Sequence, residues 1–324
     1  MKAEKDMRHY FAILYISIII ISIKYGPITP FYGDLYVYKN FYESFGQDFR
    51  IQDYFALRKE PLFFFFMYLI SAIGPFTFYV HFHSCLFFAS VMKTISDYSV
   101  NFWRSIAVML PIVLYFSPFI SLSGYILRQG EGFIFLFLSG FYLRDLRRWK
   151  SSMVMILVAA GFHVSFFFYF PVLIMIRLLK NGTSIARLWA LSAILYVADV
   201  YHYLSFFLSG LDLSAFMSSD GTDDFVVGFK YKYLLFSLIP FVFYMFRFYR
   251  NVIDVYPVWR QLWFIYLVSN ALGFTFSWFP FYNRVMYFSW VLIPFMFIPC
   301  VDQFFAYHIR RKKDPYYKPY VLAD

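Results

Sequence analysis

The chain has 324 residues, of which 61% are hydrophobic and only 15% charged, against about 25% charged residues in an ordinary soluble domain. A water-soluble globule could not bury 47 Phe and 30 Tyr side chains, and the composition also excludes a disulfide scaffold, a coiled coil and a disordered chain. Long apolar runs without alternation argue against a β-barrel. We therefore predict an all-α polytopic integral membrane protein with a single transmembrane domain, residues 1–324.

Positive charge lies mainly at the ends of the apolar segments. The chain has 29 basic and 19 acidic residues, a net charge of +10. Basic residues at segment ends are typical of topology signals and of contacts with anionic lipid, so we expect no nucleic-acid partner.

The first apolar run, 10–23, follows three basic residues, which predicts a cytoplasmic N-terminus. Residues 24–60 form the first outer loop in this interpretation, part of it an interfacial helix. Nine further apolar runs follow, at 61–73, 78–95, 105–121, 131–145, 153–176, 188–210, 233–249, 261–280 and 285–305.

The basic tail, 306–324, is expected in the cytoplasm, and counting back from it places a second outer loop at 211–232. Two stretches do not fit single crossings. Residues 61–95 are expected to break at Gly74–Pro75, and residues 152–178 at Pro171. We predict about 8–11 transmembrane helices, one or two of them broken or re-entrant, with both termini inside.

Two outer carboxylates are candidate catalytic groups. Asp34 is followed by Tyr38 in the first outer loop, and Glu60–Pro61 opens a span. Proline and a carboxylate at this position are typical of a helix start. The alternative function of Glu60 is a general base at the membrane surface.

Two arginines lie outside the membrane in this topology, against the usual charge bias. Arg128, followed by Gln129, needs an anionic partner, which could be Glu131 or a ligand phosphate. Arg284 follows Asn283 and precedes Tyr287 at the start of the last span.

His163 and Ser165 mark a buried polar site in an apolar run. A buried histidine bonded to a serine or a backbone carbonyl is one interpretation; a ligand for a phosphate or hydroxyl is the other. The acidic loop with Asp220, Asp223 and Asp224 has no defined metal-ligand spacing, so we treat it as solvated and predict no metal site.

These elements, in this order, resemble the EpsG-like family of polysaccharide polymerases, relatives of the Wzy O-antigen polymerases. The matching pieces are Asp34…Tyr38, Glu60–Pro61, Leu127–Gly130, His163–Ser165 followed by Pro171, and Arg284…Tyr287. The chain departs from the family pattern at Glu131–Gly132, where a small aliphatic pair is usual.

The resemblance implies a GT-C-like membrane glycosyltransferase of the bacterial inner membrane. The enzyme would join undecaprenyl-pyrophosphate-linked repeat units into O antigen, capsule or exopolysaccharide at the outer face. A growing lipid-linked glycan would be the donor and a single lipid-linked repeat unit the acceptor; membrane lipid and a chain-length regulator protein are further partner candidates. No cofactor or metal is required.

Such a site needs cations for the pyrophosphate, a base for the acceptor hydroxyl and aromatic surfaces for sugars. Arg128 and Arg284 are expected to bind the pyrophosphate, and Glu60, Asp34 or His163 to act as base. The remaining substrate-binding candidates are Gln129, Tyr38, Ser165, Asn283 and Tyr287. Competing functions are a transporter or flippase of lipid-linked glycan, an O-acyltransferase and a structural membrane subunit.

Overall fold

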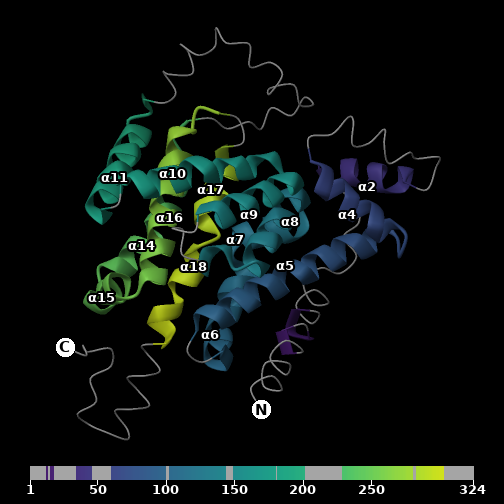
Figure 1. Ribbon diagram of the computed structural model, residues 1–324, viewed down its shortest axis with the longest axis horizontal. Helices are drawn as coiled ribbons and strands as arrows, with labels where there is room; N and C mark the ends of the chain where they lie inside the picture. Colours follow the sequence, from purple (N-terminus) through teal and green to yellow (C-terminus); the bar gives the residue numbers. More distant parts are fainter. Residues whose placement is uncertain are drawn as a thin grey trace, which may run out of the picture. The chain divides into compact units, whose positions relative to one another are not determined.

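The computed structural model describes residues 12–13, 15–17, 34–45, 60–99, 102–143, 149–179, 181–200, 228–279 and 282–302. These residues form α-helices and short 3-10 helices, with no β-strand among them (Figure 1). The all-helical prediction is confirmed for this part of the chain. The contacts between residues divide the chain into two compact units, which we describe separately. Unit 1 comprises Met1–Arg144, Arg148–Phe167 and Val301–Tyr317, and unit 2 comprises Asp145–Arg147, Phe168–Cys300 and Lys318–Asp324.

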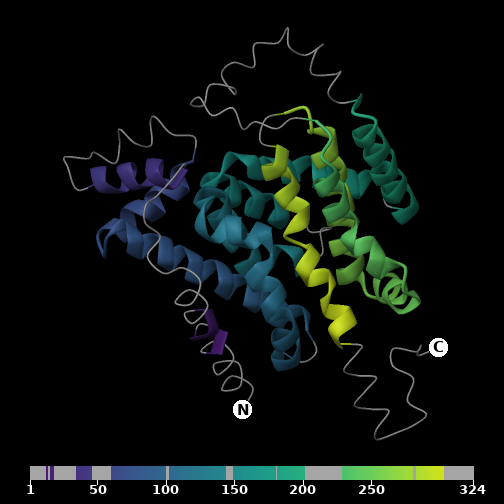
Figure 2. The same ribbon diagram turned by 180° about the vertical axis from the view of Figure 1, so that it is seen from behind.

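Unit 1 is built around the packing of α8 against α5 and α9. Its helices are α2 (Asp34–Ser44), α4 (Pro61–Ser71), α5 (Phe76–Tyr98), α6 (Phe102–Tyr115), α7 (Ser117–Gly124), α8 (Leu127–Leu138), the 3-10 helix η1 (Phe141–Leu143), α9 (Trp149–Phe162) and most of the 3-10 helix η2 (Val164–Phe168). Helix α8 packs between α5 and α9, and α4 packs on α9 (Figures 1 and 2). This packing brings the starts of α4 and α8 near the end of α9.

Helix α2 joins unit 1 through one apolar face. Its buried residues Leu35, Tyr38 and Tyr42 are three and four positions apart, so they lie on one side of the helix. Tyr38 packs edge-on against Phe63 of α4, with ring centroids 5.3 Å apart. The Tyr42 hydroxyl donates to the Gly74 carbonyl oxygen at 2.5 Å. The predicted helix within residues 24–60 is confirmed; its place at the membrane surface stays a prediction.

The predicted break at Gly74–Pro75 is confirmed. Helix α4 ends at Ser71, and Pro75 is the residue that precedes α5. The apolar run 105–121 does not form one continuous helix. It divides at Phe116 into α6 and α7, which are bent by 70°.

The predicted break at Pro171 is wrong. Pro171 is the third residue of α10, just after η2 passes into α10, and the helix continues through it to Leu179. The helix is interrupted earlier, at His163, and continues as η2. The physical reason is that the N–H groups of Val164 and Ser165 donate to side chains instead of to helix carbonyls.

Unit 2 is centred on α16. Its helices are α10 (Tyr169–Leu179), α11 (Gly182–Val197), α14 (Tyr231–Tyr244), α15 (Arg247–Val255), α16 (Pro257–Thr275), α17 (Tyr282–Trp290) and α18 (Ile293–Met296). The apolar run 233–249 is divided between α14 and α15. Helix α16 packs on α10, α11, α15 and α17.

A buried polar network ties α16 to its neighbours. The Asn270 amide donates to the hydroxyls of Ser237 and Ser289 at 2.8 and 3.0 Å. Its oxygen accepts a hydrogen bond from the Trp189 indole at 2.8 Å. Because both the amide nitrogen and the oxygen of Asn270 have partners in an apolar interior, the network fixes how these helices pack.

Among the described residues, the stretch Tyr282–Asp302 is long and apolar enough to cross a membrane, and the bent pair α6–α7 would be a second if it is one span. Five shorter apolar helices of 10–17 residues accompany them. About 20 residues are needed for one complete crossing. The count of 8–11 spans and the single transmembrane domain stay predictions. The basic tail 306–324, most of the first run and loop residues 211–227 lie outside the described residues.

Candidate active site

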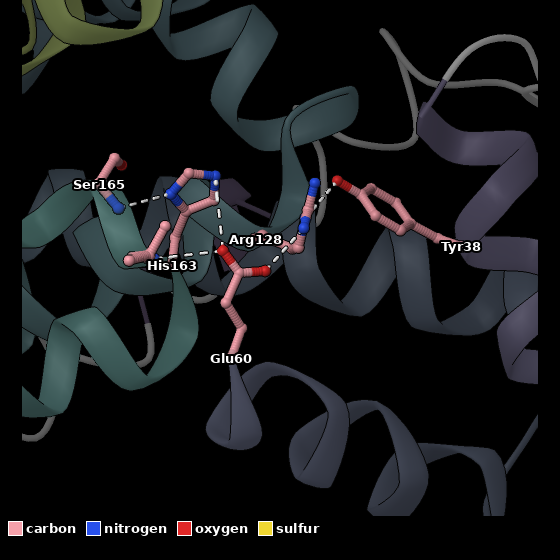
Figure 3. Close-up of polar contacts among 6 residues, drawn as sticks. Tyr38, Glu60, Arg128, His163 and Ser165 are labelled. Atoms are coloured by element: carbon pink, nitrogen blue, oxygen red, sulfur yellow. Dashed lines mark hydrogen bonds and ion pairs between the residues drawn. The ribbon is translucent and has the colours of Figure 1, made fainter. Parts of the chain in front are cut away.

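Arg128 is the centre of a polar cluster in unit 1 (Figure 3). Helix α8 begins at Leu127, so Arg128 lies in its first turn. Its Nη1 donates to Glu60 Oε2 at 2.7 Å, and its Nε donates to the Tyr38 hydroxyl at 2.9 Å. The guanidinium also lies 5.4 Å from the centroid of the Tyr38 ring. Two donors of the rigid guanidinium thus connect α8 to α2 and to the residue that precedes α4.

Glu60 supplies the carboxylate of this cluster. It is the residue that precedes α4, and Pro61 is the first helical residue, as the sequence indicates. Its side chain, however, makes no hydrogen bond to its own helix. Glu60 Oε1 instead accepts from the Val164 N–H at 3.2 Å, while Oε2 binds Arg128. The carboxylate therefore does more than mark a helix start.

Within the cluster, the Arg128 side chain is more exposed to solvent than that of Glu60. The Glu60 side chain is 7% exposed and that of Arg128 is 29% exposed. Nη2 of Arg128 has no hydrogen-bond partner among the described residues. Arg128 can therefore hold the buried carboxylate on one edge and bind a further anion on the other.

His163 lies beside Glu60 on the side away from Arg128 (Figure 3). Its Nε2 is 3.8 Å from Glu60 Oε1. Its Nδ1 accepts a hydrogen bond from the Ser165 N–H at 3.1 Å, so neutral His163 carries its hydrogen on Nε2. The imidazole consequently presents an N–H, not a lone pair, toward the carboxylate.

Ser165 contributes to the cluster through its backbone. The expected hydrogen bond between His163 and a serine is present, but the donor is the Ser165 N–H. The Ser165 hydroxyl is buried without a hydrogen-bond partner among the described residues.

Two glycines allow neighbouring segments to pack closely against the backbone of α8. A Cβ at Gly130 would collide with the Leu122 carbonyl oxygen and the His83 ring, and a Cβ at Gly132 would collide with the Phe166 ring. Phe166 belongs to η2, the segment that follows His163. Gly132 therefore lets η2 rest on α8, which places His163 and the Val164 N–H at the cluster.

One interpretation of the sequence made Glu131 the anionic partner of Arg128, and this is wrong. The partner is Glu60. Glu131 faces α5, where it accepts a hydrogen bond from the Tyr79 hydroxyl at 2.5 Å and lies 3.8 Å from His83. Sequence reasoning missed this second cluster, although a carboxylate between two glycines in an apolar run was a usable signal.

The other predicted residues of unit 1 lie outside the cluster. Asp34 is the first residue of α2, one turn before Tyr38, and neither Glu60 nor Arg128 makes a hydrogen bond or ion pair with it. Gln129 is fully buried in α8. Their roles in binding or catalysis stay predictions.

Asn283, Arg284 and Tyr287 all lie on α17 in unit 2. The Asn283 side-chain oxygen accepts a hydrogen bond from the Arg284 N–H at 3.0 Å. Tyr287 is 9% exposed and packs against Trp290. Joint binding of one pyrophosphate by Arg284 and Arg128 stays a prediction.

A model of the EpsG family matches residues 7–317. Searches of curated proteins and of solved structures find no match to the chain. The matched residues include every member of the Glu60–Arg128 cluster and the start of α17. Since the match spans nearly the whole length, the chain belongs to the EpsG family, which suggests a membrane protein with a polysaccharide polymerase role in the broad sense.

Proposed function

We propose that the chain is a membrane glycosyltransferase that joins undecaprenyl-pyrophosphate-linked repeat units into a long glycan. The observation that supports the proposal is the ion pair between Glu60, our candidate base, and Arg128, our candidate pyrophosphate-binding group. Membership of the EpsG family supports a polymerase in the broad sense. Two lipid-linked glycans, donor and acceptor, would be the substrates.

In the proposed reaction, the terminal sugar hydroxyl of the acceptor attacks the anomeric carbon of the donor. A new carbon–oxygen bond forms, and the bond from that carbon to the pyrophosphate oxygen breaks. Undecaprenyl pyrophosphate leaves with the electron pair, and the hydroxyl proton passes to a base. The protein therefore has to stabilise the charge on the leaving group and accept one proton.

Arg128 is our candidate for the leaving group. Its Nη1 and Nε are held by Glu60 and Tyr38, so the guanidinium plane is fixed before any substrate arrives. Nη2 has no partner among the described residues, and the side chain is part-exposed. A donor that is held in one orientation at the exposed edge of the site binds phosphate better than a flexible cationic side chain does.

Glu60 is our candidate for the base. The alternative, His163, has its basic Nδ1 occupied by the Ser165 N–H. The same geometry directs Nε2–H toward Glu60, so we assign His163 a positioning role in this proposal. Asp34 remains the second candidate, since it lies one turn from Tyr38 on α2.

We further propose that this site faces the outside of the bacterial inner membrane, with both termini in the cytoplasm. The charge distribution of the sequence supports this orientation, because the basic tail and most interhelical arginines would then be inside. Lipid-linked repeat units displayed at that face could reach Arg128 from the bilayer.

The experiment is complementation of a deletion strain with Glu60→Gln. This change keeps shape and removes basicity, so the ladder of long surface glycan should collapse to a single repeat unit. A positioned base contributes about 10²–10⁴-fold in rate. Glu43→Gln is the matched control, because Glu43 forms an exposed ion pair with Lys39 on α2. Normal ladders with Glu60→Gln would remove Glu60 from the mechanism.

A further inference from the structure

A second ionisable pair is buried in unit 1 and has no part in the proposed reaction. His83 of α5 is fully buried and the side chain of Glu131 of α8 is 3% exposed, with Nδ1 and Oε1 3.8 Å apart. An ionisable group in an apolar interior is costly unless it is paired. Within an apolar helix bundle such a pair usually has a function.

The hydrogen bonds of His83 fix its tautomer. Nε2 lies 3.0 Å from the Leu122 carbonyl oxygen, which can only accept, so Nε2 carries the hydrogen. Neutral His83 then has a bare lone pair on Nδ1. Neither Nδ1 nor Glu131 Oε2 has a hydrogen-bond partner among the described residues.

A bare nitrogen facing an ionised carboxylate is unfavourable, because both groups are acceptors. One additional proton removes the conflict. On Nδ1 it makes an imidazolium beside a carboxylate, and on Glu131 it makes a neutral acid beside a neutral imidazole. In either form the pair carries one proton more than its fully deprotonated state.

We propose that His83 and Glu131 bind one proton between them and that this proton holds α5 against α8, which keeps Arg128 in place. His83 lies directly on the backbone of α8, because a Cβ at Gly130 would collide with its ring. Gly130 is two residues from Arg128, so a displaced His83 would move the helix turn that carries the arginine. Both members of the pair are positioning residues.

The ionisable side chains that act on the Glu131 carboxylate are His83 and Tyr79 of α5. Arg128 lies three residues earlier on α8, and its charge is paired with Glu60 at the start of α4. From α5, the Tyr79 hydroxyl donates to Glu131 at 2.5 Å; from α2, the Tyr42 ring lies 5.7 Å from that of Tyr79, and Tyr38 lies near by at Arg128. Helix α7 contributes no ionisable side chain. Removal of the shared proton at alkaline pH should therefore leave an uncompensated charge and weaken the contact between α5 and α8.

The test is thermal unfolding of the purified full-length protein in detergent, from neutral to alkaline pH. We expect the wild-type unfolding temperature to fall by roughly 5–10 °C as the proton is lost. Glu131→Gln keeps an acceptor for Tyr79 and supplies permanent amide hydrogens, so this fall should disappear. If that variant fails to fold, Glu131→Ala removes the carboxylate and should abolish the fall as well.

Ser84→Ala is the matched control. It deletes the hydrogen bond from the Ser84 hydroxyl to the Ser123 carbonyl oxygen, 2.6 Å, one residue from His83 and without an ionisable group. This variant should lose stability equally at every pH and keep the wild-type pH dependence. A pH-dependent fall in Glu131→Gln equal to that of the wild type would overturn the proposal.

The positioning role needs a second measurement, binding of farnesyl pyrophosphate, and it rests on the proposed function of Arg128. Wild-type affinity should fall about tenfold over the same pH interval, whereas that of Glu131→Gln should not. Constant wild-type affinity despite falling stability would refute the positioning role. No binding at any pH would count against the pyrophosphate site itself, while the unfolding data would still decide the proton site.

Discussion

Replacement of Arg128 by lysine keeps the charge and removes the planar group. Arg128 makes three contacts: Nη1 to Glu60 at 2.7 Å, Nε to the Tyr38 hydroxyl at 2.9 Å, and its plane to the Tyr38 ring at 5.4 Å. A lysine ammonium can replace the ion pair but cannot also reach Tyr38 with a fixed second donor. The variant should fold, yet its cation will no longer be fixed in orientation.

The expected magnitude follows from the number of donors lost. A charge-assisted hydrogen bond contributes about 1.5–3 kcal/mol, and partial exposure of Arg128 favours the lower end of that range. Loss of one such bond to the pyrophosphate predicts a roughly 10–100-fold weaker affinity. Chain extension should fall by a similar factor or more.

The assay is binding of undecaprenyl pyrophosphate to the protein in lipid nanodiscs, together with the length of surface glycan in complemented cells. Arg250→Lys is the control, since Arg250 is an exposed arginine on α15. Normal lipid binding and normal glycan ladders in Arg128→Lys would show that Arg128 is structural. That result would favour a transporter over a transferase.

Three further predictions test other parts of the account. Gly132→Ala should clash with the Phe166 ring and lower the free energy of unfolding by about 1–3 kcal/mol, measurable by thermal unfolding. Asn270→Ala should leave the Trp189 indole without its acceptor, remove one donor each from Ser237 and Ser289, and cost about 1–3 kcal/mol; an unchanged unfolding temperature would refute the role of the network. Cysteines that replace Arg128 or Arg284 should react with an impermeant thiol reagent added outside intact cells, and labelling only from the cytoplasmic side would invert the proposed topology.

Local patterns in the sequence predicted single elements of the fold well. Glycine and proline at 74–75 predicted the division between α4 and α5, because proline disfavours a helical residue before it. Pro171 misled the same reasoning, because proline is tolerated in a first turn. The true break at His163 depends on Glu60, which lies 104 residues from Val164 and accepts its N–H. No local pattern encodes such a contact.

In the candidate site, too, local sequence indicated single residues but not the contacts between them. Glu60 and Arg128 each stand out in the sequence, one as a carboxylate before a proline and the other as an outer arginine. Their pairing joins residues 68 positions apart, so it could not be derived from spacing. Glu131 was the nearer anion in sequence, but its carboxylate lies beside His83 of α5, whereas the side chain of Arg128 reaches Glu60 at the start of α4.

The most direct test is a reconstituted reaction that contains purified protein and one lipid-linked repeat unit as both donor and acceptor. We predict products of two or more repeat units, with one undecaprenyl pyrophosphate released for each new bond, and at least a hundredfold less product with Glu60→Gln, consistent with about 10²–10⁴-fold from a positioned base. The Glu60→Gln protein should still bind the lipid, because Arg128 keeps its charge and its hydrogen bond to Tyr38. Translocation of the lipid-linked unit without any new glycosidic bond in the wild type would contradict the account.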